Sequence, residues 1–323
     1  MSRFFTRKNI IIYSLLIGLI AVFFVYNFPN SVGKMFLAAQ DAGTKVSSVI
    51  LAHNPKTILA LRSNYLGVSG NVQKKVRILI VPGHDPFYGG TEFKDLKERE
   101  IVADLGNYLE QYLKKDSHFD VVLSRDVNAW SSTFVNYFND NWSAIKDWQK
   151  ASHQEMSYLI SVGGAVKPTP KVFHNDAPKD VALRLYGVTK WANENDADIV
   201  IHLHLNDYPG HGNRQGVYSG FSIYVPGEQY LNSTTTKAVA QKIFNRLEKN
   251  YSVSNLPGES SGIVDELELI AIGANNTADA ASMLIEYGYI YEPKFATASV
   301  QSLTLQNMAY QTYLGLKDFF EQK

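Results

Sequence analysis

The stretch that decides the fold is VRILIVPGHDPFYGGTEFKDLKERE, residues 76–100. Its first six residues are apolar apart from one arginine and rich in β-branched side chains, which is typical of a buried strand. Pro82 and Gly83 end that strand, because proline has no N–H to donate and glycine allows a tight turn. His84 therefore follows the C-terminal end of a strand, where open α/β sheets place their ligands.

A helix is predicted directly after this polar loop. Its apolar residues recur at helical spacing and form one stripe: Ile101, Leu105, Tyr108, Leu109 and Tyr112. Glu98 lies on the same side of the helix as this stripe. Glu100 is about 200° around the helix from Glu98 and is expected to face water. Glu98 is thus the inward carboxylate, although a solvated glutamate at a helix start is the ordinary alternative. An imidazole and a carboxylate are two of the three protein ligands of a catalytic zinc site.

Composition narrows the possible chemistry. The chain has 323 residues, with 31 basic and 31 acidic side chains, and nothing in this balance indicates a nucleic-acid partner. It contains no cysteine. That excludes a thiolate nucleophile, a disulfide scaffold and a cysteine-ligated zinc finger. Any transition metal must therefore be held by histidine and carboxylate.

The N-terminal segment predicts a single-pass membrane protein. Residues 1–9 form a basic tail, and residues 10–28 are uncharged and long enough to cross a bilayer as a signal anchor. The basic flank predicts that the tail stays in the cytoplasm. A cleaved signal peptide is the alternative, but its apolar region is usually about 7–15 residues long. We expect residues 29–75 to be an extracytoplasmic stalk, so that the main domain lies outside the cytoplasmic membrane.

Further strands are predicted at residues 119–124, 199–205, 220–225, 262–272 and 282–286, with helices at 181–191, 234–249 and 295–320. The strand IVIHLHL places His202 and His204 on one face, because side chains alternate along a strand. A lone histidine on a strand is more often structural than a ligand, but two on one face at a strand end favour a metal site. Glu286 lies at the end of the strand SMLIE.

The ordered set is therefore His84, Glu98, His204 and Glu286. Two imidazoles and one carboxylate leave a tetrahedral zinc ion with one open position for water. Bound zinc lowers the pKa of that water to about 7, and a carboxylate that is not a ligand can then take its proton.

These residues lie in motifs that resemble those of the zinc-dependent N-acetylmuramoyl-L-alanine amidases of the amidase 3 family. PGH at 82–84 resembles the first histidine motif, KER at 97–99 the glutamate-bearing helix start, and LSRD at 123–126 a strand-end TRD segment. ADIVIHLHLND at 197–207 is similar to the segment that carries the second metal histidine. SMLIEYGYI at 282–290 is similar to the segment with the catalytic glutamate, and GIVDELELIAI at 262–272 to a stretch that lines the substrate groove.

The resemblance implies a catalytic domain at residues 76–320. Its expected fold is a twisted, mostly parallel six-stranded sheet flanked by helices, of the phosphorylase/hydrolase-like α/β class. It implies that His84, Glu98 and His204 hold Zn²⁺, that Glu286 is catalytic, and that a serine is usual where His202 stands. The implied reaction is hydrolysis of the amide between the lactyl group of N-acetylmuramic acid and L-alanine. Display outside the cytoplasm on the predicted anchor suits this substrate, because peptidoglycan lies outside the cytoplasmic membrane.

Three departures from the family pattern leave alternatives open. His202, which stands where serine is usual, is a second candidate ligand. Asp85 stands where glycine is usual, and it either accepts a hydrogen bond that fixes the tautomer of His84 or is simply a turn residue. Residues 130–178 form an excursion that is longer than usual. Its aromatic side either packs on the domain or lies over the groove as a lid hinged at Gly163 and Gly164. Some relatives are held inactive by an inserted helix, so an activator protein acting on this excursion is one expected partner.

Two other functions remain compatible with the motifs. One is a zinc hydrolase of the same fold that acts on another wall amide or on a free muropeptide. The other is a non-catalytic protein that binds the wall or activates another enzyme. Retention of all four residues favours the enzyme.

Overall fold

A computed structural model describes residues 54–67, 74–169 and 178–321 of the chain. None of the helices within these ranges is long and apolar enough to cross a membrane. The basic tail at 1–9 and the anchor at 10–28 lie outside the described residues, so both remain predictions.

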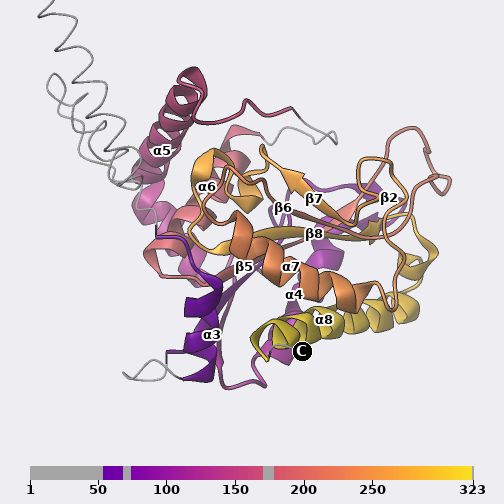
Figure 1. The fold of residues 1–323 in the computed structure, drawn as a ribbon. Coiled ribbons are helices and arrows are strands. Elements are labelled where there is room, and N and C mark those ends of the chain that lie inside the picture. Colours follow the sequence, from indigo (N-terminus) through magenta and orange to yellow (C-terminus); the bar gives the residue numbers. More distant parts are fainter. Residues whose placement is uncertain (1–53, 68–73, 170–177, 322–323) are drawn as a thin grey trace, which may run out of the picture. The chain divides into compact units, whose positions relative to one another are not determined.

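The centre of the domain is a six-stranded sheet (Figure 1). Its strands, in spatial order, are β4 (Phe119–Leu123), β1 (Val76–Pro82), β5 (Ile199–Asn206), β8 (Ala281–Tyr289), β6 (Ser222–Pro226) and β7 (Ile263–Glu266). Neighbouring strands pair in parallel except at β6 and β8, which are antiparallel. This confirms the predicted mostly parallel six-stranded sheet.

Helices cover both faces of the sheet (Figure 1). One layer consists of α4 (Glu98–Leu113), α7 (Ser233–Leu247) and α8 (Ala298–Phe320), and it packs on alternate strand residues such as Ile80, Leu203 and Ile285. The other layer contains α5 (Ser132–Ser161) and α6 (Lys179–Glu194). A small antiparallel pair, β2 (Glu92–Phe93) and β3 (Leu96–Lys97), lies in the loop between β1 and α4.

The segment 262–272 was expected to be one strand, and this was wrong. The strand β7 ends at Glu266, and two short 3-10 turns follow, η1 (Ile270–Ile272) and η2 (Ala274–Asn276). Ile272 is fully buried in a cluster with Tyr224 and Leu284. The apolar residues at 270–272 are therefore buried in a turn and not in a strand. The pattern of a short apolar run does not by itself distinguish a buried turn from a strand. The closing helix α8 begins at Ala298, after the turn η3 (Pro293–Phe295).

The described part of the excursion is dominated by the 30-residue helix α5. Its buried side chains share one side of the helix: Phe134, Phe138, Ile145, Trp148, Ser152 and Met156. That side packs on α6, where a Cβ at Gly187 would lie 2.9 Å from both Phe138 and Ile145. The contacts therefore favour a helix packed on the domain over one that covers the site.

Part of the expected stalk is packed on the domain as well. The helix α3 (Ile58–Leu66) places the ring of Tyr65 at 4.6 Å from that of Phe320. Just before α3, the N–H of Lys56 donates to the carbonyl of Asp279 at 2.9 Å, and its ammonium pairs with Asp196. Asp279 and Asp196 precede β8 and β5, so this segment joins the sheet at its amino-terminal edge.

Candidate metal centre and active site

His84 is presented by the end of β1. An added Cβ at Gly83 would lie 2.4 Å from the ring of His204, so only glycine permits this close approach. His84 itself has a φ of 67°, in the left-handed region that residues other than glycine rarely adopt. The turn that ends β1 thus directs the first histidine toward β5.

Glu98, the first residue of α4, is 2% exposed. Its Oε2 atom lies 2.8 Å from Nε2 of His84 and accepts from the N–H of Thr91 at 2.9 Å. Its Oε1 atom lies 3.0 Å from Nδ1 of His204 and accepts from the N–H of Leu205 at 3.0 Å. The carboxylate therefore bridges the two histidines and is fixed by two backbone donors.

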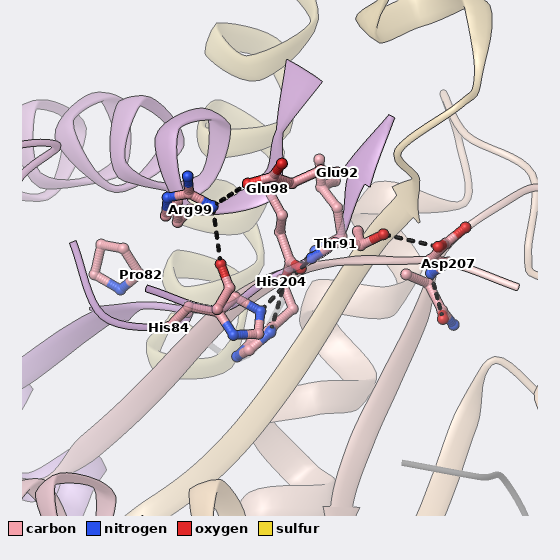
Figure 2. A network of polar contacts seen from close by, with 12 residues as sticks. Pro82, His84, Thr91, Glu92, Glu98, Arg99, His204 and Asp207 are labelled. Atoms are coloured by element: carbon pink, nitrogen blue, oxygen red, sulfur yellow. Dashed lines mark hydrogen bonds and ion pairs between the residues drawn. The ribbon is translucent and has the colours of Figure 1, made fainter. Parts of the chain in front are cut away.

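His84, Glu98 and His204 each offer one ligand atom, and these three atoms lie within 4.8 Å of one another. Figure 2 shows the three side chains converging from β1, α4 and β5. The two imidazole rings are 4.9 Å apart, in an edge-on arrangement. The structure thus brings together the three residues that the sequence predicted as metal ligands.

The electrostatics of the cluster suit a cation. Burial by itself would raise the pKa of Glu98, but the two imidazoles lower it well below its usual value, so the carboxylate stays ionised. Burial lowers the pKa of His204, so its imidazole is neutral at neutral pH. An ionised carboxylate and neutral imidazoles are the forms in which these side chains bind metals. Two nitrogen donors and one carboxylate fit zinc in particular.

His202 is not part of the cluster. It is 1% exposed, and neither ring nitrogen has a hydrogen-bond partner within the described part of the chain. Burial lowers the pKa of His202 to about 3, so this imidazole is neutral. It lies deeper along β5, paired in register with Val81 of β1 and Leu284 of β8. We interpret it as a buried structural side chain.

Glu286 lies beside the cluster, because its position on β8 is paired in register with His204 of β5. Its Oε2 atom is buried and has no hydrogen-bond partner among the described residues. Burial raises the pKa of Glu286 well above its usual value, and the charges of Glu98 and Glu259 add to this effect. A carboxyl group with a raised pKa next to a candidate metal site is suited to moving protons.

Glu259 was missed in the sequence. It is fully buried, and its two oxygens accept hydrogen bonds from Asn206, Tyr224, Ser254 and Tyr289 at 2.5–3.0 Å. These donors come from the ends of β5 and β8, the middle of β6 and one loop. Because Glu259 lies in the irregular stretch GESSG, no periodicity marked it as a buried residue.

A second set of contacts missed in the sequence links the loops around the cluster. The Thr91 hydroxyl donates to Asp207 at 2.7 Å, and the other oxygen of Asp207 lies 2.8 Å from Nε2 of His211 (Figure 2 shows the Thr91–Asp207 contact). Asp207 follows β5 directly. The loop before α4 is therefore tied to the loop after β5 through Thr91, the same residue whose N–H donates to Glu98.

Of the two roles left open for Asp85, the structure supports the turn residue. Its Oδ1 atom accepts from the N–H of Phe87 at 3.1 Å. Its Oδ2 atom accepts from Nε1 of Trp130 at 3.0 Å and from Arg184 at 3.2 Å. The carboxylate is thus engaged by its own turn, by the segment just before α5 and by α6.

An α/β sheet with a histidine–glutamate–histidine cluster at its carboxyl edge, and a further buried carboxyl group beside it, defines a protein with a candidate catalytic metal site. Comparison with protein families adds a specific likeness: residues 171–318 match the amidase 3 family, described as N-acetylmuramoyl-L-alanine amidase. The matched segment contains His204 and Glu286. His84 and Glu98 precede it in the sequence and join it in the fold.

Solved structures share the fold over most of the domain. One is the N-acetylmuramyl-L-alanine amidase Ami1 from Mycobacterium smegmatis, 14% identical, which covers 77% of this chain and 98% of its own with a TM-score of 0.50. Another is the CwlD amidase from Clostridioides difficile in complex with the GerS lipoprotein, 15% identical, which covers 77% of this chain and 100% of its own, also with a TM-score of 0.50. None of the proteins of curated function matches this chain.

Proposed function

We propose that this protein is a zinc-dependent amidase that hydrolyses the bond between N-acetylmuramic acid and L-alanine in peptidoglycan. One observation carries the proposal: the cluster of His84, Glu98 and His204 lies at the carboxyl edge of an amidase fold, with Glu286 paired in register beside it. The family match over residues 171–318 supports the same reaction.

The three residues of the cluster would hold the zinc ion through one atom each. When bound, zinc supplies a Lewis acid that polarises the amide carbonyl and lowers the pKa of water to about 7. Glu98 contributes the negative charge of the site, and its backbone donors, Thr91 and Leu205, keep the carboxylate in place. His84 and His204 complete the set of ligands.

Glu286 is the proton carrier in the proposed reaction. It takes a proton from the attacking water as the bond between the water oxygen and the lactyl carbonyl carbon forms. When the bond between carbon and nitrogen breaks, the same carboxyl group gives that proton to the nitrogen of L-alanine. A group that must both accept and donate works best with a pKa near the operating pH, and the burial of Glu286 shifts its pKa in that direction.

We propose that the domain acts outside the cytoplasmic membrane, held there by an uncleaved anchor at residues 10–28. The arrangement of the described residues is compatible with this. The segment before α3 joins the sheet at its amino-terminal edge, whereas the cluster lies at the carboxyl edge. A chain anchored through its N-terminus therefore does not cover its own site at the point where it enters the domain.

A protein partner that acts on the excursion is the remaining part of the proposal. The solved CwlD amidase of the same fold is in complex with the GerS lipoprotein, which shows that a protein of this fold binds another protein. In this chain the far end of the excursion exposes apolar side chains, with Val162 57% and Val166 69% exposed. Such side chains are available to a partner.

Digestion of purified peptidoglycan tests the proposed reaction. Mass analysis of the products should find free stem peptides that begin with L-alanine, together with glycan strands that have lost them. Glu286→Gln is the matched control, since it keeps the shape of the side chain and is expected to release almost nothing. Fragments cut at a different bond would show that the protein hydrolyses another amide of the cell wall. Zinc-loaded protein that releases no fragments would favour a wall-binding or activator function.

A further inference from the structure

The backbone of His84 adopts a conformation that must be held in place. A residue other than glycine in the left-handed region costs about 1–3 kcal/mol and persists only where its surroundings fix it. His84 has this conformation, with a φ of 67°, and in it the Nε2 atom of its ring lies 2.8 Å from Oε2 of Glu98. The contacts on both sides of His84 therefore identify the residues that hold it.

On the N-terminal side the holding residue is Arg125, whose side chain is fully buried. Its guanidinium donates to the carbonyl of Pro82 at 3.2 Å and to that of Gly83, the two residues that precede His84. It also donates to the carbonyl of Arg99, in the first turn of α4, at 2.9 Å. Arg125 thus connects the backbone before His84 with the helix that carries Glu98.

On the C-terminal side the holding residue is Asp85, which is 7% exposed. Its carboxylate accepts from Trp130 and Arg184, and its backbone closes a tight turn with Tyr88. Trp130 is itself fixed by the aromatic side chains of α5, with its ring 5.2 Å from that of Phe138. The backbone after His84 is therefore attached to the helical layer.

Arg125 and Trp130 belong to one small hairpin. The two residues pair as an antiparallel bridge, and a turn from Asp126 to Ala129 connects them. A single element therefore contacts both sides of His84, through Arg125 on the N-terminal side and Trp130 on the C-terminal side. The hairpin follows β4 and leads directly into α5.

From this geometry we infer that the hairpin 125–130 is a clamp that positions His84 for metal binding, with Trp130 acting through Asp85. The inference rests on the proposed function, because it assumes that His84 is a metal ligand. Arg125, Asp85 and Trp130 are positioning residues and do not touch the metal. The clamp gives the start of the excursion a role in metal binding, although none of the excursion's described residues belongs to the ligand cluster.

Trp130→Phe tests the clamp with little change in packing, because it keeps an aromatic ring and removes the N–H that donates to Asp85. Loss of a group that orients a metal ligand typically weakens metal binding about 10–100-fold. We expect that loss in the zinc dissociation constant, measured by competition with a chelator. We also expect an altered visible spectrum of the cobalt-loaded protein, which reports the ligand geometry directly.

Trp142→Phe is the matched control, since it makes the same chemical change on α5, where Trp142 contacts Lys146. It should leave zinc affinity and the cobalt spectrum unchanged. Arg184→Gln removes the other side-chain donor to Oδ2 of Asp85 and should also weaken zinc binding. The unfolding temperature of the metal-free proteins separates positioning from general damage, because the two tryptophan variants should unfold at similar temperatures.

The inference is overturned if Trp130→Phe and Arg184→Gln bind zinc as tightly as the unaltered protein. It is also overturned if Trp142→Phe weakens zinc binding equally. In both cases the proposed function stands, because the unaltered protein still holds zinc. An unaltered protein that retains no zinc would overturn the metal site and the clamp together.

Discussion

The Oε1 atom of Glu98 lies 3.0 Å from Nδ1 of His204, although 106 positions separate the two residues in the chain. The same carboxylate reaches His84 through its other oxygen, at 2.8 Å. One side chain therefore joins the end of β1, the start of α4 and the end of β5. This arrangement leads directly to a prediction about which histidine binds metal.

His204→Ala should abolish zinc retention and activity, because it removes one of three ligands. His202→Ala should leave the zinc content near that of the unaltered protein, since His202 is buried two residues deeper along β5 and its ring nitrogens have no hydrogen-bond partner among residues 54–67, 74–169 and 178–321. Zinc per protein, measured by atomic emission after gel filtration, distinguishes the two variants. Loss of zinc on the His202 change alone would assign the ligand to the other histidine of β5.

Glu286→Gln should bind zinc normally and be nearly inactive. The amide cannot carry the proton from water to the leaving nitrogen, and removing a positioned acid–base group typically lowers the rate about 10²–10⁴-fold. The rate is measured on peptidoglycan at a zinc content matched to that of the unaltered protein. Substantial remaining turnover would show that another group moves the proton.

Glu259→Gln should move the acid side of the pH–rate profile to lower pH. The free carboxylate form of Glu286 is needed to take the proton, so activity falls as the pH drops through the pKa of Glu286. That pKa is raised by burial and also by the negative charge of Glu259, so removing this charge should lower it. The profile of kcat/KM against pH, recorded for both proteins, measures the shift. An unchanged acid limb would mean that Glu259 serves only to join the strand ends.

His202→Leu should make the metal-free protein less sensitive to acid. The pKa of His202 is lowered to about 3 in the folded protein, against about 6.5 in an unfolded chain. The unfolded state therefore binds a proton that the folded state does not. The free energy of unfolding falls by about 1.4 kcal/mol for each pH unit below about 6.5, until the pH reaches the pKa of His202 in the folded protein. Urea unfolding at several pH values between 7.5 and 4.5 should show a weaker pH dependence for the variant. An identical pH dependence would contradict the buried, neutral state of this imidazole.

Phe134→Ala should destabilise the protein by about 3–5 kcal/mol, as expected for a large side chain removed from a core. Phe134 is fully buried, and its ring lies 4.9 Å from that of Trp191 on α6. The neighbouring Val135 is 41% exposed, so Val135→Ala is a control that should have little effect. Urea unfolding measures both. A small loss of stability together with a rise in activity would instead support a lid.

The amino-acid sequence by itself determined the class of fold and the identity of the candidate ligands. Buried parallel strands are continuous apolar runs, and turn residues interrupt them sharply, so the strand ends that carry His84, His204 and Glu286 were visible as local patterns. The helix that carries Glu98 was visible as an apolar stripe. The segment 262–272 was mispredicted because a short apolar run is compatible with either a strand or a buried turn.

Only the tertiary structure decided how those residues meet and what holds them. The family resemblance had already favoured His204 over His202, but the geometric basis of that choice is how far along β5 the carboxylate of Glu98 reaches, which no spacing within one strand specifies. The clamp of Arg125 and Trp130, and the burial of Glu259 among donors from separate strands, depend on contacts between segments far apart in the chain. The physical reason is that periodicity records which side of an element is buried, whereas hydrogen bonds between loops depend on the positions of whole elements in space.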